Sequence, residues 1–249
     1  MSEVQLQIDY SPPPFAVSDE VAIEDAQRGH SHLSLISTLA SLRSWRYLFA
    51  KRVIDIVLAL VMITVMLIPG LVIAAVILFS SGGPVFYRET RIGRRGVPFR
   101  IWKFRSMRRN SAWFGWKDKD TPDGHGSALK WRVHKKSADP RVTVFGGFLR
   151  RWSLDEIPQF WNVLCGEMSL VGPRPVVQEE VAMYGYLENF YLAATPGLSG
   201  LWQISGRSDV AFSRRAKLDA FYVQNWTLRG DFAILLRTVP AVLSKRGAR

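Results

Sequence analysis

The chain has 249 residues, of which 48% are hydrophobic, and a formal net charge of +12, which is enough for one compact domain with additional segments. Cys165 is the only cysteine, so an internal disulfide is excluded, and its apolar neighbours favour a small buried filler over a nucleophile. The positive charge lies beyond residue 44, where there are 31 Lys and Arg and 15 Asp and Glu. It implies an anionic partner: nucleic acid, an anionic membrane surface or phosphorylated substrates.

Residues 1–44 are predicted to form a poorly ordered tail. They hold six acidic and two basic residues, and the run Ser11-Pro12-Pro13-Pro14 favours an extended backbone. A secretory signal is not indicated, because acidic residues come before any apolar core and the long apolar run begins late.

The longest apolar segment, residues 53–79, predicts a membrane-associated helix. It carries one charge, Asp55, and a break at Pro69-Gly70, and a helix needs about 20 apolar residues to cross a bilayer. Two features favour a re-entrant helix. Proline bends a helix because it lacks the N–H group, and basic residues flank both ends, which the positive-inside rule assigns to the cytoplasmic side. A kinked spanning helix is the alternative.

A basic stretch, residues 88–109, follows with nine Arg and Lys and one Glu. Within it, residues 97–105 alternate between apolar and basic side chains, which predicts a strand with one basic face. Such residues either bind anionic lipid headgroups or form a wall that binds substrate phosphates. Residues 110–137 are rich in Gly and Trp and are predicted to form a loop or lid, whose aromatic side chains either anchor at the membrane interface or pack within the loop.

From residue 139 the chain is typical of a soluble mixed domain. Residues 147–152 form a short basic segment. Helices are predicted at residues 153–164, 176–192, 211–226 and 231–243, and a glycine-rich loop is predicted at 195–207. The last two helices are expected to be amphipathic.

Asp155 and Glu156 are the first candidates for chemistry. They are predicted at the start of a helix, where Pro158 is compatible with the first turn and the helix dipole keeps a carboxylate ionised. An ionised carboxylate in a basic cleft can attack an electrophilic phosphorus, and a neighbouring carboxylate can bind Mg²⁺. The alternative is structural: Ser153 and Glu156 fit a capping box, and Asp155 fits a helix cap.

Arginines near this pair favour phosphate chemistry. Arg174 lies between two prolines in Gly172-Pro173-Arg174-Pro175, so its backbone is stiff and its guanidinium suits bidentate phosphate contact. Arg150 comes five residues before Asp155, and Arg207 ends the glycine-rich loop. Carboxylates among arginines suit phosphoryl transfer, in which charge on the transferred group must be neutralised.

Nine short motifs follow one another between residues 51 and 243. They are Lys51-Arg52-x-x-Asp55, Gly83-Pro84-Val85-Phe86-Tyr87-Arg88, Lys103-Phe104-Arg105-Ser106-Met107, Asp139-Pro140-Arg141-Val142-Thr143, Leu149-Arg150-Arg151, Ser153-Leu154-Asp155-Glu156-Ile157-Pro158-Gln159, Asn162-Val163-Leu164, Met168-Ser169-Leu170-Val171-Gly172-Pro173-Arg174-Pro175 and Pro196-Gly197-Leu198-Ser199-Gly200. With these motifs in this order, the chain resembles the bacterial sugar transferase family, the small monotopic polyprenyl-phosphate phosphoglycosyl transferases. Within the family it resembles the galactosyl and glucosyl phosphate transferases that initiate exopolysaccharide synthesis.

The resemblance implies a reaction and a set of site residues. In this family the Asp of the Asp-Glu pair, here Asp155, attacks the β-phosphate of a UDP-sugar, releases UMP and becomes a phospho-sugar ester, which undecaprenyl phosphate then attacks. The Glu of the pair, here Glu156, binds Mg²⁺. The implied substrate-binding positions are Lys103, Arg150, Arg174, Pro175, Arg207 and, loosely, Asp219.

The resemblance also implies how the chain meets the membrane. Lys51, Arg52, Asp55 and Pro69 match the anchoring segment of the family, a re-entrant helix that breaks at a Ser-Pro pair. This chain has Ile68-Pro69, so the proline is kept and the polar contribution of the serine is lost. Lys51 and Arg52 are expected to stay with the lipid headgroups.

The expected architecture is of the α+β class. A mostly helical cytoplasmic catalytic domain, residues 83–249, contains a short β element and is attached to the bacterial inner membrane by the re-entrant helix, residues 45–82, and by interfacial amphipathic helices. The expected partners are a UDP-sugar (UDP-galactose or UDP-glucose), undecaprenyl phosphate and membrane lipid, with no nucleic acid. A second copy of the chain is the remaining candidate partner.

Two competing interpretations come from other functional classes. A membrane-tethered nucleic-acid-binding protein would use the basic and aromatic residues, but it gives no reason for the Asp155-Glu156 pair or for Pro173-Arg174-Pro175, and no zinc-finger or RNA-recognition motif is present. A non-catalytic membrane scaffold or anion-binding protein would use Asp155 only as a cap.

Overall fold

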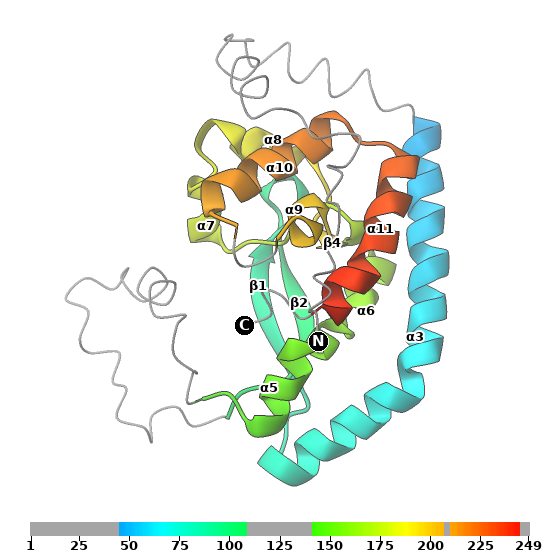
Figure 1. Cartoon of the computed structure of the whole chain (residues 1–249), viewed down its shortest axis with the longest axis vertical. Coiled ribbons are helices and arrows are strands. Elements are labelled where there is room, and N and C mark those ends of the chain that lie inside the picture. Colours follow the sequence, from blue (N-terminus) through cyan, green and yellow to red (C-terminus); the bar gives the residue numbers. More distant parts are fainter. Residues whose placement is uncertain (1–44, 109–140, 207–209, 245–249) are drawn as a thin grey trace, which may run out of the picture. The chain divides into compact units, whose positions relative to one another are not determined.

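A computed structural model of the chain describes residues 45–108, 141–206 and 210–244. Its helices are α3 (Trp45–Ser81), α5 (Val144–Arg151), α6 (Gln159–Cys165), α7 (Gln178–Ala182), α8 (Glu188–Ala193), α9 (Leu201–Ile204), α10 (Phe212–Gln224) and α11 (Leu228–Leu243), with 3-10 turns η1 (Arg94–Gly96), η4 (Leu154–Glu156) and η5 (Gly185–Leu187), and its strands are β1 (Phe86–Ile92), β2 (Pro98–Phe104), β3 (Ser169–Val171) and β4 (Gly197–Ser199). These elements belong to one compact unit (Figure 1). They are mostly helical with two small sheets, which confirms the predicted α+β class. The predicted tail and the predicted lid lie outside the described residues.

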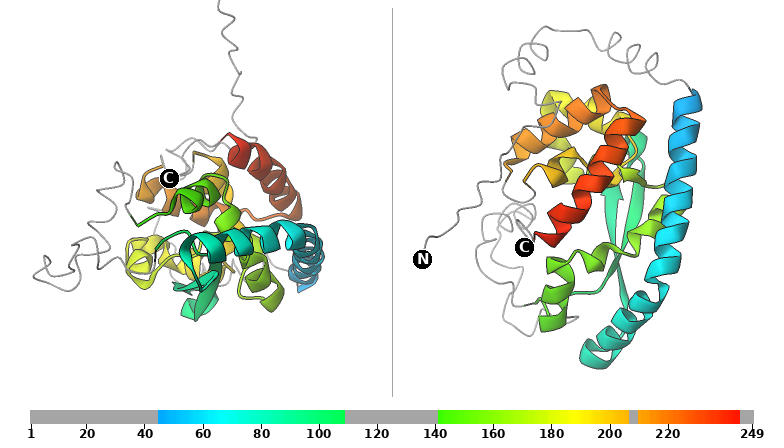
Figure 2. Two further views of the ribbon diagram at one scale, coloured as in Figure 1. Left: turned by 90° about the horizontal axis from the view of Figure 1, so that it is seen from below. Right: turned by 45° about the vertical axis from the view of Figure 1, so that its right-hand side comes forward.

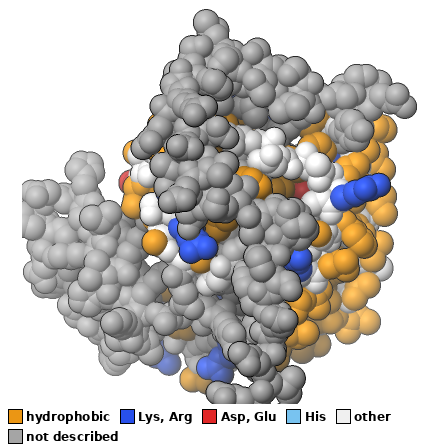
Figure 3. All heavy atoms as spheres, turned by 45° about the horizontal axis from the view of Figure 1, so that its top comes forward, with side chains coloured by type: hydrophobic (Ala, Val, Ile, Leu, Met, Phe, Trp, Pro, Cys, Tyr) orange, Lys and Arg blue, Asp and Glu red, His pale blue; other side chains and the backbone are white. Residues whose placement is uncertain are grey.

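Helix α3 is long, apolar and bent. Pro69 lies inside it, and the helix changes direction along its length (Figures 1 and 2), as expected where a proline removes a backbone hydrogen bond and its ring displaces a carbonyl group. Many large hydrophobic side chains of α3 are exposed, and Figure 3 shows a band of them along the edge formed by this helix. Within the described part of the chain, α3 is the single helix long and apolar enough to cross a membrane.

The C-terminal part of α3 is fixed to the strand that carries Lys103. Ile73 and Ile77 pack with Phe104 of β2 in one buried cluster. Arg105, the residue after β2, donates hydrogen bonds to the carbonyl groups of residues 81–83, the last residue of α3 and the two that follow it. These carbonyl groups have no partner inside the helix, so a guanidinium is well suited to bind them.

The antiparallel pair β1–β2 confirms the predicted strand but not its single basic face. Phe99 and Ile101 are buried, and Lys103 shares their face because side chains two apart point the same way. Arg100 and Trp102 lie on the other face. The alternation of apolar and basic residues changes phase between residues 101 and 102, so the basic side chains are divided between the two faces.

The parallel pair β3–β4 sets the start of the loop that carries Arg174. Ser169 lies opposite Gly197, and Val171 lies opposite Ser199. Gly172 then passes so close to the neighbouring segment that a Cβ at this position would lie 2.4 Å from the carbonyl oxygen of Thr195. A side chain at residue 172 would push the two segments apart, which explains the glycine before Pro173.

Three local predictions differ from the structure. The predicted helix at residues 176–192 is divided into α7, η5 and α8, since Gly185 has a φ of 55°, a conformation that favours glycine and interrupts a helix. The predicted loop at 195–207 contains β4 and α9. Cys165, predicted to be buried, is exposed at the end of α6, so its apolar sequence neighbours did not indicate burial.

Candidate active site

Asp155 and Glu156 lie in the 3-10 turn η4, between α5 and α6. The turn begins at Ser153, whose φ of 56° is left-handed and whose side chain makes no capping hydrogen bond. Helix α6 begins later, with Pro158 at its N-cap. The capping-box interpretation is therefore wrong, and the pair does not form the first turn of a longer helix. The carboxylate of Glu156 is directed to other elements.

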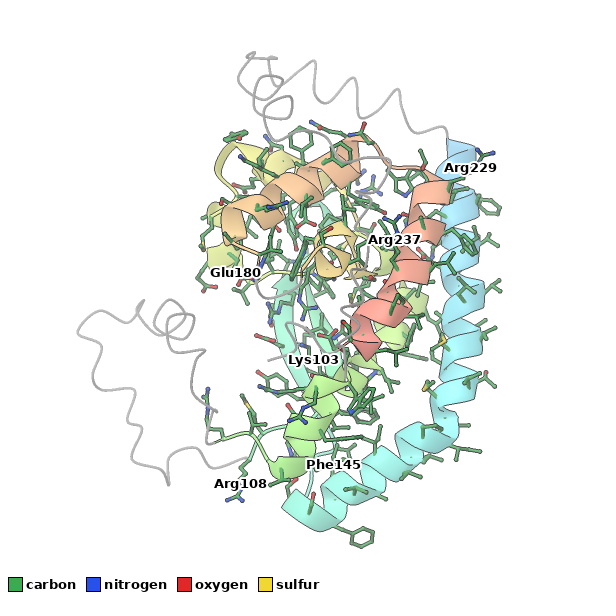
Figure 4. The ribbon with its side chains drawn as sticks, in the orientation of Figure 1. Lys103, Arg108, Phe145, Glu180, Arg229 and Arg237 are labelled. Carbon is green, nitrogen blue, oxygen red and sulfur yellow. The ribbon has the colours of Figure 1, made fainter. Side chains whose placement is uncertain are left out.

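Glu156 joins two cations that are distant in the sequence. Its Oε1 accepts a hydrogen bond from Arg174 at 2.7 Å and from the Nζ of Lys103 at 3.3 Å. Lys103 projects from the end of β2 near α5 (Figure 4), and Arg174 comes from the loop after β3. Three separate elements thus meet at one carboxylate.

Arg150 of α5 adds a third cation to this part of the cavity. Its Nε donates to the hydroxyl of Ser106 at 2.8 Å, so α5 is tied to the segment that follows β2. Arg150, Lys103, Arg174, Asp155 and Glu156 all line one cavity of about 1510 Å³. The structure therefore brings together five of the predicted site residues.

The two adjacent carboxyl groups have opposite pKa shifts. Burial by itself would raise the pKa of Glu156, but the charges and hydrogen bonds of Arg174 and Lys103 outweigh it and lower that pKa to about 2. Burial, followed by the charge of Glu156, raises the pKa of Asp155, and Lys103, Arg150 and Arg174 oppose that rise. Glu156 is thus a permanent anion, whereas the ionisation of Asp155 depends on its cationic neighbours.

The carboxylate pair fits a magnesium ion of the kind that binds phosphates. The described residues hold no group of three or more His, Cys, Asp or Glu that could form a complete cage. Mg²⁺ is commonly bound by one or two carboxylates, with substrate phosphates and water as the other ligands. Glu156, ionised and at the cavity wall, is the residue best suited to hold it.

Several residues that line the cavity were not identified from the sequence. Glu89 and Arg91 of β1 line it and pair with each other at 2.6 Å. Trp202 of α9 and Arg215 of α10 also line it, with the guanidinium 4.5 Å from the indole ring centroid. In the sequence, only the basic stretch at residues 88–109 pointed toward this part of the cavity, and it did not indicate any of these four residues individually.

Lys51 and Arg52 bind the protein, in contrast to the predicted headgroup contacts. Lys51 donates to the carbonyl of Val171 at 3.1 Å and pairs with Asp231 at 2.5 Å. Arg52 donates to the carbonyl groups of residues 163 and 164 at the end of α6, where a cation complements the free carbonyls and the helix dipole. Both cations anchor α3 to the folded domain.

Asp55 has a similar inward role. It is buried, and its carboxylate accepts a hydrogen bond from the backbone N–H of Leu170 at 3.1 Å. Since Leu170 belongs to β3, this contact ties α3 to the strand that leads to Arg174. Pro175, also predicted at the site, accepts a hydrogen bond at its carbonyl from Arg91 at 3.5 Å and is not among the side chains that line the cavity. Arg207 lies outside the described residues.

Asp231 forms a polar centre that the sequence did not indicate. Its carboxylate accepts hydrogen bonds from the hydroxyl of Tyr222 at 2.7 Å and from the indole of Trp226 at 2.9 Å, in addition to Lys51. The hydroxyl of Tyr222 also lies 3.1 Å from the carbonyl oxygen of Val171. Helices α3, α10 and α11 are therefore joined to the end of β3 at one buried carboxylate.

Asp219, a predicted substrate-binding residue, lies away from the cavity. It is buried in α10, and its Oδ2 accepts a hydrogen bond from Tyr184 at 2.9 Å. It does not line the cavity, and its Oδ1 has no hydrogen-bond partner in the part of the chain that the structure describes. Burial raises the pKa of Asp219 to about 8, although the Tyr184 hydrogen bond lowers it.

This raised pKa predicts how stability changes with pH. An unfolded Asp has a pKa of about 3.9, so above that pH the folded state keeps a proton that the unfolded state has lost, and stability falls as the pH rises toward the folded pKa. We expect the melting temperature of the wild type to fall between about pH 5 and about pH 8, and to fall less in Asp219→Asn. Thermal unfolding in detergent at a series of pH values measures this change in melting temperature. Glu179→Gln in α7 is the control, and an Asp219→Asn curve as steep as wild type would contradict the prediction.

Known proteins are similar to most of this chain. The model of the family described as "Bacterial sugar transferase" matches residues 46–245. The chain is 43% identical to the exopolysaccharide production protein ExoY of Sinorhizobium fredii over 205 residues, which cover 80% of this chain and 88% of that protein. It is 45% identical over 201 residues to the UDP-galactose-lipid carrier transferase of Erwinia amylovora, and 44% identical over 200 residues to the undecaprenyl-phosphate galactose phosphotransferase of Salmonella typhimurium; each match covers 80% of this chain and 42% of the longer relative.

Proposed function

The chain belongs to the bacterial sugar transferase family, and from that premise we propose that it is a polyprenyl-phosphate phosphoglycosyl transferase of exopolysaccharide synthesis. In this proposal it transfers a hexose-1-phosphate from a UDP-sugar, UDP-galactose or UDP-glucose, to undecaprenyl phosphate and releases UMP. The names of the Erwinia and Salmonella relatives support the sugar donor and the lipid carrier. The name of the Sinorhizobium relative supports the role in exopolysaccharide production.

One observation carries the proposal: a buried Asp155 lies beside an ionised Glu156 in a cavity that Lys103, Arg150 and Arg174 also line. Phosphoryl transfer depends on positioning and on neutralising the charge of the transferred group. The diphosphate group of a UDP-sugar is strongly anionic, so this cationic lining is suited to bind it. Its charge also favours the ionised form of Asp155, which the reaction needs.

In the first step, a carboxylate oxygen of Asp155 attacks the β-phosphorus of the UDP-sugar. The bond between that phosphorus and the oxygen that bridges to the α-phosphate breaks, and UMP leaves with the bond's electron pair. The sugar phosphate is then held on Asp155 as an acyl phosphate. Arg174 and Lys103, both bound to Glu156, are placed to neutralise the phosphate oxygens.

In the second step, a phosphate oxygen of undecaprenyl phosphate attacks the same phosphorus. The bond between the phosphorus and the Asp155 oxygen breaks, which restores the carboxylate and yields the polyprenyl diphosphate sugar. A magnesium ion on Glu156 would supply further positive charge for the phosphates. Lys103, Arg150 and Arg174 would serve both steps, because each step passes through the same phosphoryl group.

We further propose that α3 enters one leaflet of the bacterial inner membrane and turns back. Both ends of this helix contact the same folded unit: Lys51 binds Asp231 at one end, and Ile77 packs near Phe104 at the other. A helix that crossed the bilayer would place its two ends on opposite sides of the membrane, where they could not both contact one cytoplasmic domain. Pro69 supports the turn, and the cytosolic supply of UDP-sugars favours a catalytic domain on the cytoplasmic side.

The experiment that tests this function is a UMP-release screen. The purified protein is mixed with Mg²⁺, undecaprenyl phosphate and one UDP-sugar at a time, and UMP and the lipid-linked product are both measured. We expect equal amounts of the two products with UDP-galactose or UDP-glucose. A protein that releases no UMP with any UDP-sugar, while it still binds membranes, would support the scaffold interpretation.

A further inference from the structure

Two helices, α3 and α11, contribute apolar side chains to the cavity that the carboxylates also line. Leu58, Met62 and Met66 of α3 line the cavity, and their spacing of four residues puts them on one face of that helix. Leu235 and Val239 of α11 line the same cavity with a similar spacing. The start of α11 lies beside α3, and the two helices diverge toward the C-terminal end of α11 (Figures 1 and 2). We name the space between these stripes the α3–α11 trough.

The trough is continuous with the reaction centre. Ile157 and Phe160, which come directly after the Asp155-Glu156 pair, line the same cavity, as does Leu170 of β3. A ligand that lay along this cavity would therefore pass from an apolar end to a cationic end. The ligand that fits has a long hydrocarbon part and one anionic head.

The outer faces of both helices are also apolar. Val61 and Val65 of α3 are 51% and 57% exposed, and Leu236 of α11 is 59% exposed; none of the three lines the cavity. The rims of the trough thus present apolar side chains on their outer sides. A hydrocarbon chain could move from a bilayer into the trough without crossing a polar surface.

We propose that the α3–α11 trough binds the hydrocarbon chain of the lipid acceptor, while the acceptor's phosphate lies among Lys103, Arg150 and Arg174. This inference rests on the proposed function. The flexible Met62 and Met66 suit a chain with many conformations, because methionine adapts to irregular apolar shapes. The trough accordingly selects acceptors by chain length and has no part in binding the sugar donor.

Filling the trough separates acceptor binding from donor chemistry. Met62→Trp and Leu235→Trp place a large ring in the trough, and Val61→Trp and Leu236→Trp place the same ring on the outer faces as neighbouring controls. We expect the two trough variants to lose at least about tenfold in kcat/KM for undecaprenyl phosphate, through a higher KM. The UMP released per enzyme molecule from the UDP-sugar without acceptor should equal that of wild type.

A second measurement compares acceptors of different length. Wild type should prefer undecaprenyl phosphate to farnesyl phosphate, and this preference should fall at least about tenfold in the trough variants but not in the outer-face variants. Met62→Phe and Leu235→Phe add less volume and replace any tryptophan variant whose melting temperature falls well below that of its control. Flotation with vesicles of Escherichia coli lipid shows whether each variant still binds membranes.

The outcomes are distinct. Equal kcat/KM in trough and outer-face variants would overturn the inference and leave the proposed function intact. A loss that is confined to vesicle flotation would also overturn it, since the trough would then contact only bulk membrane lipid. If wild type itself released no UMP without acceptor, the covalent mechanism would be overturned, and kcat/KM for undecaprenyl phosphate in the trough and outer-face variants would still decide the inference.

Discussion

Replacing Asp155 with asparagine is expected to lower UMP release by at least about 10³-fold, because the amide is not nucleophilic toward phosphorus. The cations proposed to bind the diphosphate remain, so binding of the UDP-sugar should change much less than turnover. Folding should be preserved, since asparagine has nearly the same shape and burial already disfavours the charge of Asp155. The measurements are UMP release and the intact mass of the protein after mixing with UDP-sugar.

The intact mass tests the mechanism directly. Wild type without acceptor should gain the mass of one hexose phosphate, and Asp155→Asn should gain none. Asp219→Asn, which changes a carboxylate outside the cavity, is the control for adduct formation. Turnover by Asp155→Asn at a rate near wild type, in a preparation free of other transferases, would exclude a covalent role for this residue.

The longest element could be predicted from the sequence. The apolar run predicted α3, whose end at Ser81 lies one residue from the predicted boundary. The three-residue strands β3 and β4 were missed because two or three side chains are too few for any periodicity. They pair between segments some 28 residues apart (Ser169 with Gly197), and it is this pairing that positions the loop of Arg174.

In the candidate site too, patterns among neighbouring residues could be read from the sequence, but contacts between distant residues could not. The resemblance to the family assigned catalytic roles to Asp155 and Glu156, for which local patterns alone favoured capping, whereas the local Pro-Arg-Pro pattern already indicated Arg174. Glu156 binds Lys103, which lies 53 residues away in the sequence, and no local pattern encodes that contact. The structure adds it by bringing β2 and η4 together.

Cations beside the apolar run were misinterpreted for a physical reason. Lys51 and Arg52 have the same sequence context whether they bind lipid headgroups or the end of another helix. The structure places Arg52 on the last carbonyl groups of α6 and Lys51 on Asp231. Whether these cations bind lipid or protein depends on elements more than 100 residues away in the sequence. The positive-inside rule could therefore not predict their partners.

Replacing Glu156 with glutamine is expected to lower kcat/KM by about 10²-fold, because the carboxylate that holds Arg174 and Lys103 in place, and that would bind Mg²⁺, is lost. The pKa of Glu156 is about 2, so the substitution removes a full negative charge at every working pH. The Mg²⁺ concentration that gives half-maximal activity should rise, because one carboxylate ligand is lost. The titration of UMP release with Mg²⁺ measures both effects.

A pH profile separates this electrostatic role from a merely structural one. The charge of Glu156 raises the pKa of Asp155, so its removal should lower that pKa and move the acidic limb of the kcat/KM profile to lower pH. Glu89→Gln is the matched control. It removes a carboxylate that lines the same cavity but pairs with Arg91 rather than with Lys103 and Arg174. If Glu89→Gln shifted the Mg²⁺ titration and the acidic limb as much as Glu156→Gln does, the effect would belong to the net charge of the cavity and not to Glu156.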